Sequence, residues 1–506
     1  MKPKVLIPVL LVICLILGIT SYAVTRSDNG TSREDSSDMS PSPAPTSRPS
    51  FSQSNTTYFT AVAGQKNKLN TISLEQLQQT DPILVLETSQ ELVKSLQGFN
   101  SAHFKSITSL EEMVNVLNKS TKELGILAIE DATFKVKTLE VDNQYIYDRT
   151  LNLAEYPLQV TQEVTISTDK PDTSNLEQSK LTRLGHTGSM IPARGVTRWI
   201  NEKWAGDYTH LFKSTKPLFD TMDYTSATFE CSILGRGRQC STCMSFLGPD
   251  EFMEGVTYSG IDLFSLAANH ILDGGVEAIA NTQQKLEEAG IQHTGASTRN
   301  NDDAAQPVLV EVNGLKIAYL GFNDTPGRAQ WAMESKPGAA SISDWDLNAN
   351  GATTRYEPNE ERIKFFLQRA KDLNPDKIFV IMHWGGQEYV NQALGYQQRL
   401  GSLLLKHGAD VILGDHVHWV QEIEFQGNKP IFYGVGNYIF DQMWSTETRQ
   451  GMSIEMNFLG DKLVNFRLHP HELHLYTKGM PILLKENDPA YDQTLDRVWN
   501  VSNKIY

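Results

Sequence analysis

Short apolar runs alternate with segments of helical period between about Lys180 and Leu484. Runs such as 315–322 and 411–413 have the length and the apolar content of buried strands. Between such runs, 275–289 places apolar residues on one helical face and ends before Gly290, and 397–407 ends before Gly408. This alternation predicts a large α/β domain at 180–485, with sheets covered by helices.

The segment 58–168 also mixes strand and helix patterns. It contains apolar runs at 83–86 and 124–129, and a capping-box pattern at Ser109 that opens a helix. A small α/β accessory domain is one interpretation. The run from Glu123 to Val141 also faintly resembles part of an extracellular solute-binding domain, and the two interpretations carry equal weight.

The N-terminal segment contains a long apolar run. Residues 5–24 are apolar and nearly uncharged, which suffices to cross a bilayer, since a spanning helix needs about 20 residues. Lys2 and Lys4 precede this run, so the positive-inside rule predicts a cytoplasmic tip and transmembrane anchor at 1–26 with the rest outside the cell. A cleaved signal peptide is the main alternative.

The segments 27–57 and 169–179 are rich in residues that cannot bury a core, and we expect them to be linkers. We expect 486–506 to be a C-terminal tail.

The formal net charge is −15, from 45 basic and 60 acidic residues, which argues against a nucleic-acid partner. The chain lacks the sequence motifs of P-loop NTPases, α/β-hydrolases and dinucleotide-binding dehydrogenases. Cys231, Cys240 and Cys243 cluster in one segment, and outside the cell they predict a disulfide that staples a loop.

Candidate chemistry lies where predicted strands end. Asn269 and His270 follow one apolar run, His383 follows a second, and His416 and His418 follow a third. In α/β folds, ligands gather at the carboxyl ends of strands, and imidazoles are common metal ligands.

Any one of these motifs alone is more often a hydrogen-bonded turn. Three motifs at one edge favour a metal site and metal-assisted hydrolysis.

Three further interpretations concern single motifs. Residues two apart in an extended segment face the same side, so His416 and His418 are expected to reach one centre. Glu230 follows another predicted strand, where a carboxylate could bridge two metals. The run 469–474 has the wrong spacing for a zinc-protease helix and is expected to be a solvated turn.

Several long motifs then resemble one known family in the right order. The segments 408–418 and 430–441 closely resemble the signature of CapA-type capsule and poly-γ-glutamate synthesis proteins. Residues 265–275 match the family's "SLANNH-x-x-D-x-G", and 383–389 match "HWG-x-E-Y" with one extra residue. The resemblance covers roughly 180–458.

The resemblance implies a calcineurin-type metallophosphoesterase fold, a four-layer α/β/β/α sandwich, here preceded by a membrane anchor and a smaller α/β domain. It implies a site for two divalent ions of Mn, Fe or Zn, and it makes His270 the acid beside the leaving group. The implied metal ligands are Glu230, Asn269, His383, His416 and His418.

One departure affects the metal site directly. The family opens with Gly-Asp-x-Met-x-x-Arg, and Ser189 stands where that pattern has its metal-binding Asp. A hydroxyl is a poorer ligand than a carboxylate, and His186 is the nearest candidate to substitute for it. Thr228 also replaces an Asn that is usual in the family. The departure leaves one metal, weakly held metals or an inactive site as alternatives.

Three functions therefore remain, and the third is a solute-binding module at 58–168 that senses a small ligand. The first is an extracellular metal-dependent hydrolase or transferase that acts on an envelope polymer or its precursor. The second is a non-catalytic subunit that binds the polymer or other membrane subunits of a synthesis or export complex. In each case the N-terminal helix is expected to supply the contact with the membrane.

Overall fold

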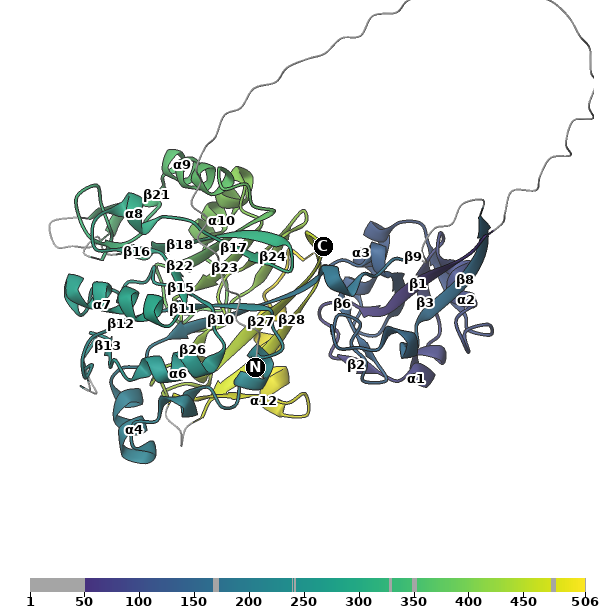
Figure 1. Cartoon of the computed structure of the whole chain (residues 1–506), viewed down its shortest axis with the longest axis horizontal. Helices are drawn as coiled ribbons and strands as arrows, with labels where there is room; N and C mark the ends of the chain where they lie inside the picture. The colour runs from purple at the N-terminus through teal and green to yellow at the C-terminus, as the bar shows by residue number, and fades with distance from the viewer. Residues whose placement is uncertain are drawn as a thin grey trace, which may run out of the picture. The chain divides into compact units, whose positions relative to one another are not determined.

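The computed structural model describes most of the chain after its first fifty residues (Figure 1). The described residues are 51–166, 173–238, 240, 243–326, 330–347, 353–474 and 479–505. The predicted anchor and most of the predicted linker at 27–57 lie outside them. Within these ranges, no helix combines the length and the apolar character that crossing a membrane requires.

A small α/β domain precedes the large one. Its sheet has the order β4–β3–β5–β1–β6, and the first half of β1 also pairs with β8 and β9. β3 is parallel to β4 and β5, whereas β1 is antiparallel to β5. The strands are β1 Phe51–Ala63, β3 Ile83–Leu86, β4 Phe104–Ile107, β5 Leu124–Ala128, β6 Lys137–Thr138, β8 Gln159–Ile166 and β9 Thr173–Ser174.

Helices cover both faces of this smaller sheet. α3 (Leu110–Lys119) begins where the capping pattern predicts, because Ser109 Oγ accepts a hydrogen bond from Glu112 N. Buried Met113 and Leu117 of α3 pack on one face, while α1 (Leu74–Gln78) and α2 (Gln90–Lys94) contribute to the core on the other.

The first sheet of the large domain has the order β15–β14–β11–β10–β27–β28–β29, and β26 also pairs with β10. β10, β11, β14 and β15 are parallel neighbours, so their carboxyl ends share one edge. The strands are β10 Leu181–Met190, β11 Tyr224–Phe229, β14 Leu263–Ser265, β15 Gln292–Thr294, β26 Asn437–Ile439, β27 Gln450–Leu459, β28 Lys462–Leu473 and β29 Pro481–Leu483.

The second sheet has the order β17–β18–β22–β23–β25–β24, and β18, β22, β23 and β25 are parallel. The strands are β17 Val308–Val312, β18 Leu315–Asp324, β22 Lys377–Trp384, β23 Val411–Asp415, β24 Ile423–Gln426 and β25 Lys429–Phe432.

The longer helices of the domain are α4 Gly195–Trp204, α6 Phe252–Ser259, α7 Gly275–Glu288, α9 Glu360–Lys371, α10 Gly395–His407 and α12 Pro489–Trp499. The shorter elements of the chain are β2 Thr71–Ile72, β7 Glu140–Val141, β12 Ser232–Ile233, β13 Leu247–Gly248, β16 Ala296–Ser297, β19 Gly338–Ala339, β20 Ser343–Leu347, β21 Thr353–Pro358, α5 Lys216–Phe219, α8 Asn301–Ala304 and α11 Thr446–Arg449.

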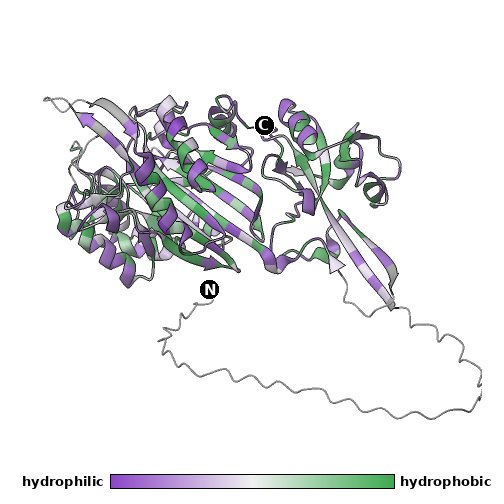
Figure 2. Ribbon diagram, turned by 90° about the horizontal axis from the view of Figure 1, so that it is seen from above, coloured by the Kyte–Doolittle hydropathy of each residue, from purple (hydrophilic) through white to green (hydrophobic). Residues whose placement is uncertain are grey.

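Alternating side chains of the second sheet divide between two cores. Ile317 and Tyr319 of β18 pack with residues of the first sheet, such as Ile454. Leu320 and Phe322 of the same strand instead pack with buried residues of α9 and α10. A third core joins the first sheet to α4, α6 and α7. Figure 2 shows hydrophobic colouring along these strands and hydrophilic patches on the helices.

The same alternation fixes the direction of polar residues at the strand ends. Phe379 and Ile381 of β22 face the first sheet, so His383 faces it too. Leu413 of β23 likewise faces the first sheet, and Asp415 follows in that direction. His383 and Asp415 are also direct neighbours in the β22–β23 register.

A bulge in β10 reverses the alternation just before the strand ends. The pairing of β10 with β11 shifts between Thr187 and Ser189. Leu184 lies in the core between the sheets, whereas Met190 lies in the core under the helices. Ser189 therefore faces the second sheet. Gly188 permits the close approach, because a Cβ there would lie 2.1 Å from the carbonyl oxygen of Gly436.

The structure differs from several expectations. β1 begins at Phe51, inside the expected linker, because its first half pairs with β8. The expected tail contains α12, whose Val498 and Trp499 are buried in the core between the sheets. The predicted disulfide is not formed in the structure: Cys231 is a buried thiol, and Cys243 Sγ donates to the carbonyl oxygen of Cys240 at 3.4 Å.

The expected solvated turn at 469–474 is also wrong, because most of it belongs to β28. Polar side chains there have buried partners: His469 Nε2 lies 2.9 Å from Glu455 Oε2, and His471 Nε2 lies 2.9 Å from the Asn437 carbonyl oxygen.

Candidate metal centre

The two sheets of the large domain meet with the carboxyl ends of their central parallel strands close together. Glu230 follows β11, and Asn269 lies in the loop after β14. His383 lies near the end of β22, and His416 follows β23. Each sheet therefore supplies two of these side chains.

His383 Nε2 is the hub of the cluster. It lies 2.9 Å from Asn269 Oδ1, 3.2 Å from His416 Nδ1 and 3.5 Å from Glu230 Oε1. Ligand atoms of Glu230, His383 and His416 all lie within 4.8 Å of one another. Two ligands bound at about 2.1 Å to one ion lie roughly 3.0–3.4 Å apart. The spacing therefore fits a single divalent ion.

Buried polar atoms without hydrogen-bond partners also support a metal site here. Both carboxyl oxygens of Glu230, Nδ1 of His383 and Oδ1 of Asp415 are buried and make no hydrogen bond. A buried carboxylate without a partner is costly, and native structures rarely contain one. A bound cation would satisfy the two carboxyl groups, so these residues fit the divalent metal that the sequence resemblance implies.

The charge states suit metal binding as well. Burial by itself raises the pKa of Glu230, but the nearby imidazoles of His383 and His418 outweigh burial and hold that pKa below its usual value. Burial, reinforced by His383, holds the pKa of His416 well below its usual value. A charged carboxylate beside a neutral imidazole is the state in which these groups bind metals.

The backbone at His416 and His418 differs from the extended segment that the sequence predicts. β23 ends at Asp415, and the two histidines lie in bends with φ of 98° and 60°. Positive φ is strained for a non-glycine residue, and such strain clusters at functional sites. The extended geometry expected here is therefore wrong, although the two ring centroids lie only 6.1 Å apart.

His418 and His270 have well-defined neighbours. His418 Nδ1 lies 2.8 Å from Asn437 Oδ1, which leaves Nε2 for another partner. His270 Nδ1 lies 2.7 Å from Asp273 Oδ2, and its ring packs 4.1 Å from the ring of Phe246. A carboxylate at Nδ1 orients the ring and leaves Nε2 as the nitrogen that can meet a substrate.

Ser189 and His186 occupy different surroundings. Ser189 Oγ donates a hydrogen bond to Asp415 Oδ2 at 2.7 Å. His186 Nδ1 lies 2.9 Å from Ser226 Oγ, and burial lowers the pKa of His186 to about 3. His186 lies before the bulge and pairs with a serine of the neighbouring strand, so the structure gives no support to its replacing the missing carboxylate.

Asp415 and Arg194 lie beside the site but were not among the predicted site residues, although Arg194 stands at the Arg of the family pattern that begins at Gly188. The parity of β23 could have identified Asp415, because it follows Val411 and Leu413 on one face. Arg194 has φ of 54°, forms an ion pair with Asp441 and lies 4.8 Å from the Phe246 ring centroid. No sequence spacing links Arg194 to Asp441, which is 247 residues away.

This chain is similar in sequence to known capsule synthesis proteins. A family model described as "Bacterial capsule synthesis protein PGA_cap" matches residues 183–442. "Capsule biosynthesis protein CapA" of Bacillus anthracis is 28% identical over 286 residues, covering 55% of this chain and 64% of that protein. "PGA biosynthesis protein CapA" of Bacillus subtilis (strain 168) is 26% identical over 289 residues, covering 57% of this chain and 70% of the relative.

Solved structures give a weaker likeness. "Calcineurin-like phosphoesterase YfkN" from Bacillus subtilis is 11% identical with a TM-score of 0.34, covering 62% of this chain and 98% of that one. A hypothetical protein from Thermus thermophilus is 15% identical with a TM-score of 0.36, covering 58% of this chain and 100% of that one. The family model spans just over half of the 506 residues, and this chain belongs to the bacterial capsule synthesis protein family PGA_cap.

Proposed function

We propose that this chain is a membrane-anchored, extracellular protein that takes part in the synthesis, export or attachment of a capsule or poly-γ-glutamate type polymer. Its centre would act as a metal-dependent hydrolase or transferase on the polymer or a precursor. Membership of the capsule synthesis family supports the polymer class. The matched segment covers 64% of the first relative, so the activity of a whole relative is carried over only as part of this proposal.

One observation carries the catalytic part of the proposal. Three ligand atoms from both sheets converge on His383 Nε2 at 2.9–3.5 Å, and two of the residues involved keep unpartnered buried atoms. Together with the three cores described above, this favours the four-layer α/β/β/α sandwich of the calcineurin-type phosphoesterases, in which two divalent ions of Mn, Fe or Zn would lie between the sheets.

The proposed roles are metal binding for one group of residues and proton donation for His270. The proposed metal ligands are Glu230, Asn269, His383, His416 and His418. A bound divalent ion would polarise the scissile group and activate water. His270, oriented by Asp273, would donate a proton from Nε2 to the leaving group.

The test is metal content together with phosphodiesterase turnover of the purified chain, with bis-p-nitrophenyl phosphate as the probe. We expect His383→Ala to lose both metal and turnover, and His270→Ala to keep the metal but lose turnover. His103→Ala is the matched control, because His103 is exposed in the smaller domain. A wild-type chain without metal and without turnover would rule out the hydrolase.

The alternative is a non-catalytic subunit that binds the polymer or other membrane subunits. The neutral Ser189, in place of the family's Asp, favours it. Under this alternative, His383→Ala would leave polymer production in cells unchanged. Membrane anchoring through 5–24 is tested separately: the chain should fractionate with membranes, and protease added outside intact cells should cleave the large domain.

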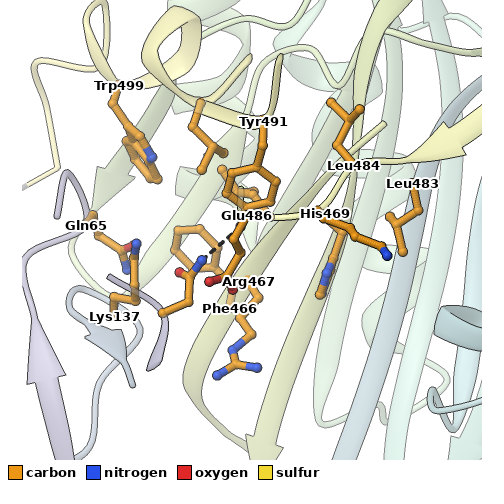
Figure 3. Close-up of a pocket in the computed structure, with 14 residues that line it drawn as sticks. Gln65, Lys137, Phe466, Arg467, His469, Leu483, Leu484, Glu486, Tyr491 and Trp499 are labelled. Atoms are coloured by element: carbon orange, nitrogen blue, oxygen red, sulfur yellow. Dashed lines mark hydrogen bonds between the residues drawn. The ribbon is translucent and has the colours of Figure 1, made fainter. Parts of the chain in front are cut away.

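A second candidate function concerns the junction between the two described domains. A cavity of about 320 Å³ lies there, lined by Gln65 and Lys137 of the smaller domain and by Arg467, Tyr491 and Trp499 of the large one (Figure 3). Its walls combine cationic groups with apolar side chains and the carboxylate of Glu486. This combination suits a small anionic solute with an apolar portion.

The two cations have spare hydrogen-bonding capacity. Lys137 is 8% exposed and donates to the carbonyl oxygen of Asn67, and Arg467 donates to Glu140 Oε1 at 2.7 Å while its Nη2 is buried without a partner. Burial, reinforced by the charge of Arg467, lowers the pKa of Lys137 to about 8. We propose that a small carboxylate binds here, in keeping with a solute-binding role for the smaller domain.

Thermal stabilisation by glutamate and by γ-glutamylglutamate tests this second function. We expect a rise in melting temperature that Lys137→Met abolishes and that the exposed-site control Lys105→Met retains. Binding should weaken as the pH rises through about 8, because Lys137 then loses its charge. No stabilisation by either probe, or the same stabilisation in Lys137→Met, would refute it.

A further inference from the structure

Ser189 and Asp415 form a buried contact between the two sheets beside the metal cluster. Ser189 is fully buried and Asp415 is 1% exposed, and their side chains meet at 2.7 Å. Ser189 is the last residue but one of β10, the first strand of the large domain, and it stands where the family pattern has a carboxylate. Asp415 brings a carboxylate to the same place from the opposite sheet.

The fold places Asp415 toward the metal cluster by ordinary strand geometry. It shares a face of β23 with Leu413 and is the register partner of His383 on the adjacent parallel strand. Neighbouring residues in a parallel register point to the same face of the sheet. Asp415 therefore lies directly beside the hub of the cluster.

The surroundings of Asp415 lack the partner that a buried carboxylate needs. One oxygen accepts from Ser189, while the other is buried and makes no hydrogen bond. Both oxygens of the Glu230 carboxyl group are likewise buried without a hydrogen bond. A cation shared by the two carboxyl groups would supply the partner that each of them lacks.

His418 lies on the same side of the cluster. Its Nδ1 contacts Asn437 Oδ1, and Asn437 is the register partner of Ser189 in the β10–β26 pair. Asp415 and His418 thus flank Ser189 from two directions. Asp415 is not one of the three residues whose ligand atoms lie within 4.8 Å of one another, so it belongs to a neighbouring position.

We propose that Asp415 supplies the carboxylate of a second metal position, replacing the aspartate that this chain lacks at Ser189. This inference rests on the proposed function, in which the centre holds divalent metal. Asp415, His418 and a shared Glu230 would hold the second ion. Ser189 becomes a positioning residue that orients the Asp415 carboxylate through its hydroxyl.

The direct test is the Mn²⁺ stoichiometry of the full-length protein, measured by titration while the electron paramagnetic resonance signal of free Mn²⁺ is followed. We expect two ions per wild-type chain and one per Asp415→Asn chain, with the second site weakened at least tenfold. The relocated pair Ser189→Asp with Asp415→Ser should restore the second ion. Asp461→Asn is the matched control, because Asp461 is an exposed carboxylate, and it should bind two ions.

The outcomes separate this inference from the proposed function. If Asp415→Asn keeps two ions, or if the wild type binds one ion that His383→Ala removes, the second position is refuted while metal binding stands. If the wild type binds no Mn²⁺ at all, both the second metal position and the proposed metal-dependent function are refuted. If Asp415→Asn fails to fold, the relocated pair decides: recovery of two ions supports the proposal, and a single ion in a folded protein overturns it.

Discussion

At the scale of single residues, the buried histidines of this chain divide into two kinds. Those near Glu230 have ligand atoms as neighbours. His186 and His471 instead lie inside the sheets, and their ring nitrogens contact a serine hydroxyl and a backbone carbonyl. Only the first kind faces groups that a metal would join.

His471 makes the stability of the protein depend on pH. Its Nε2–H donates to the carbonyl of Asn437, and its Nδ1 is buried without a partner. Burial lowers its pKa from 6.5 to about 4, so below pH 6.5 the unfolded chain binds more protons than the folded one. Stability should therefore fall between pH 6.5 and 4, by at most roughly 3 kcal/mol from this residue.

The measurement is the urea midpoint of wild type and His471→Gln at pH 7, 5.5 and 4.5. The substitution costs some stability at every pH, so the informative quantity is the slope against pH. We expect a shallower slope in His471→Gln and an unchanged one in the exposed-site control His103→Gln. Equal slopes in all three proteins would show that His471 is not buried in its neutral form.

Motif reasoning could predict Glu230, Asn269, His383 and His416 because each lies near the end of a recognisable strand or in the loop after it. The pairing of Ser189 with Asp415 could not be predicted in this way. It depends on a bulge that reverses the face of one strand and on the approach of a second sheet 226 residues later in the chain.

At the scale of elements, the bulge in β10 decides what the first strand presents to the site. Gly188 lies within it, and a Cβ there would lie 2.1 Å from the Gly436 carbonyl oxygen and 2.9 Å from Val435 Cγ2. A clash with backbone cannot be relieved by a side-chain rotation, so β10 and β26 would have to separate.

We expect Gly188→Ala to destabilise the protein by about 1–3 kcal/mol, as overpacking does, and to weaken Mn²⁺ binding because Ser189 moves. Gly395→Ala is the matched control. Gly395 begins α10, and its nearest neighbour to an added Cβ is 4.0 Å away, so that variant should be neutral or slightly more stable. Chemical denaturation measures both, and equal stability of the two variants would refute the close packing at Gly188.

Most longer elements were predictable, because β3, β18, α7 and α10 have strong periodicity with capping or glycine signals at their ends. β28 was not, because its end is polar and contains Pro470. Its polar side chains are satisfied by residues of neighbouring strands, and such partners are invisible in a local pattern. Tertiary contacts thus override the local turn signal.

At the scale of the whole molecule, the smaller domain is joined to the large one by buried polar contacts. Tyr145 Oη accepts from Nδ2 of Asn457 and from Nδ2 of Asn465, both at 2.8 Å. The guanidinium of Arg467 lies 3.5 Å from the centroid of the Tyr145 ring. No local pattern in the sequence indicates this joint, because its partners lie more than 300 residues apart.

Tyr145→Phe should weaken the joint without altering the ring that Arg467 contacts. Two buried amides lose an acceptor, which costs about 1–3 kcal/mol. We expect one unfolding transition in the wild type and a broadened or split transition in Tyr145→Phe, as followed by calorimetry. Tyr258→Phe is the control, because Tyr258 is a half-buried tyrosine outside the joint. A sharp transition with unchanged midpoint in Tyr145→Phe would contradict this role.

The contact between Ser189 and Asp415 also bears on how relatives are sorted. A survey of relatives that considers only the position of Ser189, where the family pattern has its aspartate, would classify this chain among members that have lost a metal ligand. In three dimensions, however, the carboxylate is still present and arrives from the other sheet. Classifying such proteins by occupied positions in space, with residues 189 and 415 scored as one position, would separate chains that have moved a ligand from chains that have lost it.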